Sequence, residues 1–211
     1  MLVAEWMTRD VITVVCDDKV QVAAHTLGKH RIRQVPVVEG DCLVGLVTKS
    51  DLLRACPPDL NPFSLIGSVA NELARPIRDI MTTEIITTRP DSPLEEAAHR
   101  LIDRRINALP VVANLRLVGI LTGSDISRAL LAALGAGTPG VRITFEVAGD
   151  EDVFALVSAL GAKHQVRVHN VTAFEHDGRH LAIVRLDQER PAMVEALWQG
   201  GHRVSSVARF R

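Results

Sequence analysis

The chain has 211 residues, of which 47% are hydrophobic, 23% are charged and only 3% are aromatic, and its formal net charge is -1 at pH 7. A nucleic-acid partner is disfavoured, because phosphate-backbone binding needs a basic surface and base stacking needs aromatic platforms. A membrane partner is disfavoured too, since no stretch approaches the roughly 18 continuous apolar residues of a spanning helix. The N-terminal sequence MLVAEWMTRD lacks the order of a signal peptide, so we expect a cytoplasmic protein.

The first two thirds of the chain contain the same segment twice. Residues 6–55 align without a gap with residues 80–129, so that each position meets the one 74 further along. Met7-Thr8 meets Met81-Thr82, and both copies contain the sequence Pro-Val-Val. A duplicated structural unit is therefore predicted before any single motif is interpreted.

Each copy has the pattern of a strand, a helix, two strands and a second helix. In the first copy a β-rich run covers 11–14, strands are expected over 34–38 and 42–48 with a turn between them, and the second helix starts near Asp51. The first helix is indicated by apolar residues at helical spacing, namely Val20, Ala23, Ala24 and Leu27, which the second copy matches with Leu94, Ala97, Ala98 and Leu101. The order β-α-β-β-α thus occurs twice. One copy would bury too little surface alone, so we expect the two to pack as one pseudo-symmetric body.

The first helix of the second copy carries a capping pattern. Ser92 is the predicted N-cap, Pro93 the first helical residue and Glu95 the residue that closes a capping box. In the first copy, Asp18 and Gln21 hold the places of Ser92 and Glu95.

Composition divides the chain into five parts. The first repeat unit is expected at 1–56, a proline-rich linker with a short helix over 65–73 at 57–75, and the second unit at 76–134. A Gly/Pro linker follows at 135–140. The last part, 141–211, alternates strands and helices in the order β-α-β-β-α-β, with a hairpin at Asp177-Gly178, and this order is ferredoxin-like. The fold class is therefore α/β (α+β).

Metal binding is not indicated. Cys16, Cys42 and Cys56 have no ligand spacing and are expected to be free thiols. His176 and His180 are expected to face each other across the hairpin, but no cysteine or carboxylate at ligand spacing completes a site.

The phrase Thr-x-Ser-Asp occurs before the second helix of each copy and has two interpretations. Thr48 and Asp51, like Thr122 and Asp125, are residue types that cap helices, which makes either phrase a stability device worth about 1 kcal/mol. The same residue types also bind nucleotides, because a threonine hydroxyl contacts phosphate and an ionised aspartate accepts hydrogen bonds from both hydroxyls of a ribose. Gly45 and Gly119 permit a close backbone approach nearby.

The paired phrases, the two Pro-Val-Val strands and the Met-Thr sequences resemble a tandem of CBS domains, also called a Bateman module, over residues 1–134. The resemblance implies sites for adenine nucleotides, with the aspartate on the ribose and the threonine on the phosphate side. The first site would be lined by Ile12, Thr13, Arg33, Val35, Pro36, Thr48, Lys49 and Asp51. The second would be lined by Ile86, Thr87, Asn107, Leu109, Pro110, Thr122 and Asp125.

The two implied sites differ in charge. Arg33 and Lys49 of the first site stand where the second has Asn107 and Gly123. Since cations near phosphate favour highly charged ligands, we expect the site of Asp51 to accept di- and triphosphates better than its counterpart. The alternative is that both cations are solvated surface charges.

Residues 141–211 resemble an ACT domain in pattern more than in residues. The turn at 148–152 lacks the Pro-Gly of ACT domains that bind amino acids, so a dimerising role is expected, although Gly149 and Asp150 remain candidate ligand contacts. The whole arrangement is similar to the bacterial acetoin-utilisation B proteins. It implies a homodimer with a possible partner enzyme.

No catalytic motif is present: the chain has no G-x-S-x-G, no phosphate loop and no H-E-x-x-H. We therefore expect a non-catalytic regulatory module with no bound cofactor, which senses AMP, ADP, ATP or S-adenosylmethionine. The competing hypothesis is a structural dimerisation adaptor that scaffolds a partner enzyme and binds no nucleotide. A DNA-binding regulator is disfavoured by the charge.

Overall fold

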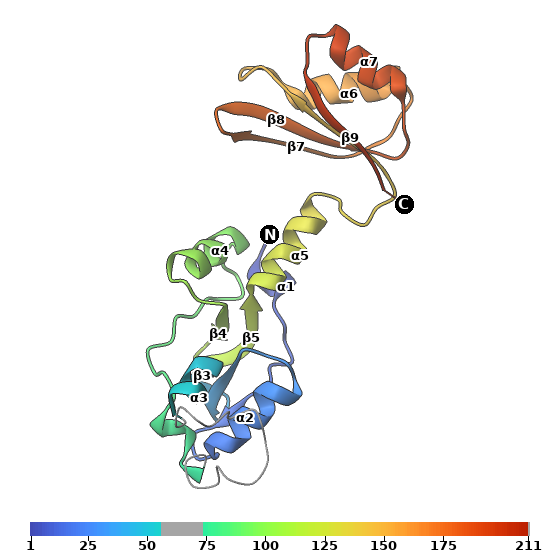
Figure 1. Ribbon diagram of the computed structural model, residues 1–211. Coiled ribbons are helices and arrows are strands. Elements are labelled where there is room, and N and C mark those ends of the chain that lie inside the picture. The colour runs from blue at the N-terminus through green and yellow to red at the C-terminus, as the bar shows by residue number, and fades with distance from the viewer. Residues whose placement is uncertain (56–73, 211) are drawn as a thin grey trace. The chain divides into compact units, whose positions relative to one another are not determined.

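The computed structural model describes residues 1–55 and 74–210, and the chain divides into two units, Met1–Ile126 and Ser127–Arg211, which are described separately (Figure 1). The expected helix over 65–73 lies outside the described residues, as does Cys56. None of the described helices has both the length and the apolar character of a membrane-spanning segment.

The first unit is built on one sheet shared by both copies. Its strands lie in the order β1-β2-β3-β5-β4. The first copy contributes α1 (Val3–Trp6), β1 (Val14–Val15), α2 (Val20–Lys29), β2 (Gln34–Glu39), β3 (Cys42–Thr48) and α3 (Lys49–Ala55). The second contributes the 3-10 helix η2 (Ile77–Asp79), α4 (Leu94–Asp103), β4 (Ala108–Ala113), β5 (Arg116–Thr122) and the first four residues of α5 (Gly123–Ala133).

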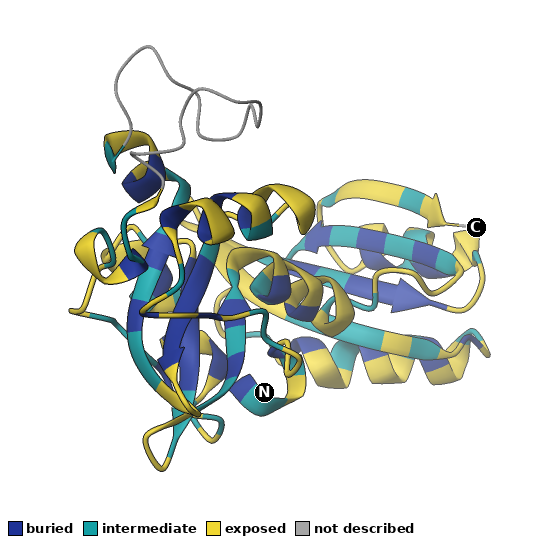
Figure 2. Ribbon diagram, turned by 90° about the horizontal axis from the view of Figure 1, so that it is seen from below, coloured by how far each residue is buried: buried dark blue, intermediate teal, exposed yellow. Residues whose placement is uncertain are grey.

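The apolar stripe predicted for α2 faces the core of the first copy. Val20, Ala23 and Leu27 are fully buried and pack with strand residues such as Val35 and Val37. Because apolar side chains recur every three or four residues, one side of the helix is covered and the other faces water, as Figure 2 shows for the helices of the unit.

Several predicted boundaries were wrong. The β-rich run at 11–14 forms only the two-residue β1, and its counterpart in the second copy, residues 85–88, forms a single parallel bridge between Thr88 and Val111. The second helices begin at Lys49 and Gly123, two residues before the aspartates and therefore near the predicted start.

The capping prediction for the first helices was wrong as well. Pro93, not Ser92, occupies the N-cap of α4, and Lys19 occupies that of α2, and neither makes a side-chain cap. Backbone carbonyls do this work: Leu94 N–H donates to Met1 O and Val20 N–H to Arg75 O, each at 3.0 Å. A remote carbonyl satisfies the same orphan donor that a capping side chain would satisfy.

The two copies exchange their Met-Thr segments, which we define as residues 7–12 and 81–86. Thr8 exchanges backbone hydrogen bonds with Ile120 of β5, and Thr82 does the same with Leu46 of β3, all at 2.9 Å. Each methionine fits over a glycine of the other copy. A Cβ built on Gly45 would overlap Met81 Sδ, and one on Gly119 would overlap Met7 Sδ.

The second unit forms a separate sheet with its own core. It contains β6 (Gly140–Glu146), α6 (Val153–Lys163), β7 (Val168–His176), β8 (Arg179–Leu186), α7 (Pro191–Gln199) and β9 (Val204–Phe210). The element order is the predicted β-α-β-β-α-β, and the antiparallel strands lie in the order β7-β8-β6-β9. Both helices lie on one face of the sheet in Figure 1, where Phe145, Val157 and Leu197 are buried together.

The hairpin at Asp177-Gly178 is present, with φ angles of 50° and 71° that suit its tight turn. The predicted facing of His176 and His180 was wrong. His176 pairs with Arg179 and His180 with Glu175, so the two histidines point to opposite faces of the hairpin. Among the residues that the structure describes, no group of three or more histidine, cysteine or acidic side chains is placed to hold a metal.

Candidate functional site

Thr48 and Asp51 form a capping box at the start of α3. Asp51 Oδ2 accepts hydrogen bonds from the Thr48 backbone N–H (2.8 Å) and hydroxyl (2.6 Å), and the Asp51 N–H donates to Thr48 Oγ1 (3.2 Å). At α5, Asp125 Oδ2 accepts from the N–H and hydroxyl of Thr122 at 2.7 and 2.6 Å.

Both aspartates are buried, with 6% of Asp51 and 3% of Asp125 exposed. The second carboxylate oxygen of Asp51 accepts from the Arg54 guanidinium. Buried carboxylates need such partners, so the two aspartates hold the helix starts and fix the threonines beside them.

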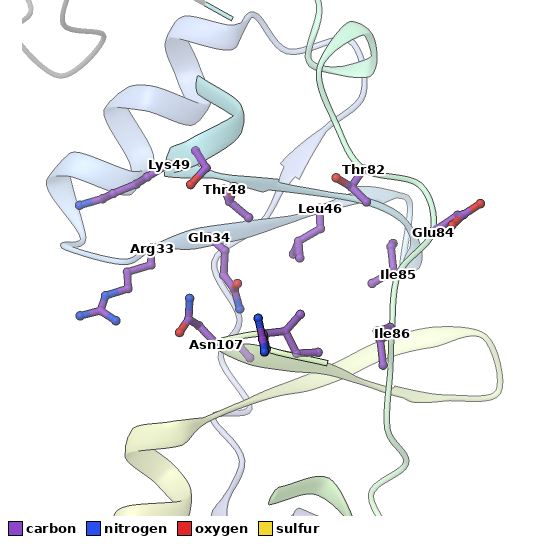
Figure 3. A pocket seen from close by; sticks show the side chains of 14 residues that line it. Arg33, Gln34, Leu46, Thr48, Lys49, Thr82, Glu84, Ile85, Ile86 and Asn107 are labelled. Atoms are coloured by element: carbon purple, nitrogen blue, oxygen red, sulfur yellow. The ribbon is translucent and has the colours of Figure 1, made fainter. Parts of the chain in front are cut away.

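A cavity of about 430 Å³ opens beside Thr48 (Figure 3). Three segments line it: the facing ends of β2 and β3 with the start of α3, the Met-Thr segment of the second copy, and the turn between α4 and β4. The lining residues are Arg33, Gln34, Leu46, Thr48, Lys49, Ser50, Thr82, Glu84, Ile85, Ile86, Arg105, Ile106, Asn107 and Ala108. Both copies therefore contribute to one pocket.

The pocket has two chemically different sides. In Figure 3 the side chains of Lys49 and Arg33 extend toward the same side, while Ile85 and Ile86 lie on the other, with Glu84 beyond them. Arg105 adds a third cation to the lining. The cationic side can attract an anionic group, and the isoleucines offer an apolar surface to a planar one.

The pocket brings together five of the residues predicted for a nucleotide site, namely Arg33, Thr48, Lys49, Ile86 and Asn107. The sequence interpretation placed Ile86 and Asn107 with Thr122 of their own copy. In the structure Ile86 lies with Thr48, because the Met-Thr segment of the second copy crosses onto β3, and Asn107 lines the same pocket from the turn between α4 and β4.

The remaining predicted residues do not line this pocket, and these are Ile12, Thr13, Val35, Pro36, Asp51, Thr87, Leu109, Pro110, Thr122 and Asp125. Val35 and Leu109 are fully buried, and their contact with a ligand stays a prediction. Their inward position follows from strand alternation, which directs Val35 and Val37 into the core.

Sequence reasoning missed the other nine lining residues, which are Gln34, Leu46, Ser50, Thr82, Glu84, Ile85, Arg105, Ile106 and Ala108. Thr82 was visible as part of a repeated Met-Thr pair to which no role was given. Arg105 carried no such signal; it stands in a turn with a φ of 51°, as Arg31 does in the first copy with 53°.

The family model of the CBS domain matches residues 3–57 and 77–132, and the chain belongs to this family. Among its relatives, a homoserine O-acetyltransferase of Methanohalobium evestigatum is 33% identical over 128 residues, which are 60% of this chain. The chain spans only 23% of that relative's length.

Solved structures with the same fold include a Vibrio cholerae protein assigned to acetoin utilization (AcuB), with 30% identity and a TM-score of 0.55 over 64% of this chain and 93% of that one. The CBS domain pair of protein MJ0100, in complex with 5-methylthioadenosine and S-adenosyl-L-methionine, has 30% identity and a TM-score of 0.51 over 63% and 97%. CBSX2 in complex with AMP has 29% identity and a TM-score of 0.53 over 62% and 96%. Homologous CBS pairs thus bind AMP or S-adenosylmethionine.

Proposed function

We propose that this protein is a non-catalytic regulatory module that binds an adenine nucleotide or S-adenosylmethionine in the pocket beside Thr48. The observation that carries the proposal is the shared lining: Thr48 and Lys49 of one copy meet Ile86 and Asn107 of the other around a cavity of about 430 Å³. This volume is in the range of small-molecule sites. The ligands bound to MJ0100 and CBSX2 all contain adenosine, and this supports an adenosine-containing ligand here.

The shared lining also supports a regulatory role. A ligand that contacts both copies has different contact energies in arrangements that place the copies differently, and only such a difference shifts a conformational equilibrium. The nucleotide is a regulatory ligand in this proposal, and no cofactor is needed.

For the second unit we propose an ACT-like domain that mediates homodimer or partner contacts. Its element order and the two free sheet edges, β7 and β9 within the described part of the chain, support this role, because edge strands can pair with another chain. A contact of Glu151 holds the turn at 148–152, since its carboxylate lies 2.8 Å from His202 Nε2. This contact favours a structural turn over a ligand loop.

One observation favours the alternative of a structural adaptor that binds no nucleotide. The hydrogen bonds between Thr48 and Asp51 account for the Thr-x-Ser-Asp phrase as a helix cap without any ligand. In that case the repeated phrases only stabilise α3 and α5.

Isothermal titration of the full chain with AMP, ADP, ATP and S-adenosylmethionine separates the two functions. Ile86→Trp fills the apolar side of the pocket and should abolish binding. Ile12→Trp is the matched control, because Ile12 holds the equivalent place in the first copy but does not line this pocket. If a ligand binds to the wild type and to Ile12→Trp but not to Ile86→Trp, the result supports the sensor. No heat with any of the four ligands supports the adaptor.

A further inference from the structure

The pocket beside Thr48 carries long polar side chains at positions where the other copy has short ones. Arg33, Gln34 and Lys49 line it, and the residues 74 positions further along are Asn107, Ala108 and Gly123. The duplicated frame is the same in both copies, so the backbone does not require these three side chains. Because only the first copy has these side chains, we infer that its pocket distinguishes one ligand from other, related ligands.

The charge of the lining shows which ligands it favours. Arg33, Lys49 and Arg105 give three positive charges and Glu84 one negative, a difference of two. The cations come from both copies, since Arg105 follows α4. Arginine and lysine bind phosphate oxygens by charge-assisted hydrogen bonds, and each added phosphate gives them further acceptors.

Gln34 adds a neutral donor to this set. Its side-chain Nε2 is buried and has no hydrogen-bond partner among the described residues, and Gln34 lines the pocket. Figure 3 shows its amide extending from β2 toward Asn107. A buried donor without a partner is unfavourable, and the terminal torsion of an amide is soft, so an acceptor in the cavity would recruit it.

We propose that this pocket selects nucleoside polyphosphates, in the order ATP, ADP, AMP, and rejects S-adenosylmethionine, with Arg33, Lys49 and Arg105 as the specificity-determining residues. The inference rests on the proposed nucleotide function and narrows it. The adenosine lies on the side of Ile85 and Ile86, and the phosphate chain extends toward Arg33 and Lys49. S-adenosylmethionine places a positive sulfonium where the phosphates would lie, and three cations repel it.

The test compares dissociation constants for ATP, ADP, AMP and S-adenosylmethionine in the wild type, Arg105→Ala and Lys49→Gly. Each substitution should raise the dissociation constant for ATP about tenfold and that for AMP no more than about threefold, since AMP offers the cations fewer acceptors. Binding of S-adenosylmethionine should stay the same or improve. Gln34→Leu should weaken the binding of ATP, ADP and AMP without changing the order of their affinities.

Arg31→Ala is the matched control. Arg31 is the counterpart of Arg105, is exposed and has the same backbone conformation, but it does not line this pocket. It should leave every dissociation constant unchanged. Thermal unfolding of each variant without ligand shows whether the fold is kept, and all four variants, at exposed or half-buried positions, should keep a cooperative unfolding transition.

The outcomes separate this inference from the proposed function. If S-adenosylmethionine binds as tightly as ATP, or if Arg105→Ala weakens all four ligands equally, the selectivity is wrong while the nucleotide function stands. If Arg31→Ala has the same effect as Arg105→Ala, the cations act only through the overall charge and the specificity role is wrong. If no ligand binds at all, both proposals are overturned.

Discussion

Asp51 illustrates how a single carboxylate can be occupied before any ligand arrives. One of its oxygens accepts two hydrogen bonds from Thr48, and the other accepts from Arg54. Replacing Asp51 by alanine would therefore remove a helix cap, worth about 1 kcal/mol, along with any contact to a ribose. A loss of ligand binding in that variant would not identify a binding residue, which is why variants of the pocket wall give the clearer test.

The cysteines allow a prediction at the same scale. Burial raises the pKa of the Cys16 thiol, and its hydrogen bond with Glu39 raises this pKa further. Cys42 is exposed. Since the thiolate is the reactive form, a raised pKa leaves less of it near pH 8, and iodoacetamide should modify Cys42 at least about tenfold faster than Cys16.

The measurement is peptide mass spectrometry of a Cys56→Ser variant during timed labelling. Denaturation removes the burial of Cys16, so the two rates should converge in urea, which serves as the control. Equal rates in the native protein would contradict the buried position of Cys16.

At the scale of elements, the Met-Thr segment of the second copy crosses β3 and forms one wall of the pocket. The Thr82–Leu46 hydrogen bonds hold this segment, and Gly45 leaves room for Met81. Gly45→Ala would place a methyl group on the Met81 sulfur and 3.2 Å from Val37 Cβ. We expect a loss of about 1–3 kcal/mol of unfolding free energy and weaker nucleotide binding, since Thr82 and Leu46 both line the pocket.

Two glycines provide controls for chemical denaturation and titration of this variant. Gly28→Ala in α2 meets no atom within 4 Å and should stabilise the protein slightly, because alanine favours a helix. Gly119→Ala overlaps Met7 as Gly45→Ala overlaps Met81, but neither Gly119 nor Met7 lines this pocket. It should cost stability and keep nucleotide affinity. Equal losses of affinity in both variants would show that the crossing acts through global stability alone.

The elements that could be predicted from the sequence are those that depend on local pattern. The stripe from Val20 to Leu27 and the Asp177-Gly178 turn need only neighbouring residues to be recognised. The caps of α2 and α4 could not be predicted, because remote carbonyls of Arg75 and Met1 provide them. The same holds for the site: Thr48 and Lys49 stood in a recognisable phrase, whereas Arg105 joins them only because the fold brings the turn between α4 and β4 of the second copy to the pocket of the first.

At the scale of the whole molecule, the two units have separate hydrophobic cores. Residues such as Val20, Val35 and Leu52 form one, and Phe145 and Leu197 belong to the other. The lining of the pocket comes entirely from the first unit, Met1–Ile126. A ligand that binds there stabilises directly only the unit that forms the site.

Because the cores are separate, we expect two unfolding transitions in calorimetry of the full chain. Because the pocket lies in one unit, ATP should raise the midpoint temperature of only one of them. A ligand at 100 times its dissociation constant adds about 2.7 kcal/mol to the unit that binds it. Hydrogen exchange with ATP present assigns the shifted transition, since protection should rise in β2 and β3 but not in β6 and β8. The Ile86→Trp variant, with its pocket filled, should show both transitions and no response to ATP. A single transition that moves as a whole would instead mean that the units unfold cooperatively, because a ligand of one unit would then stabilise both.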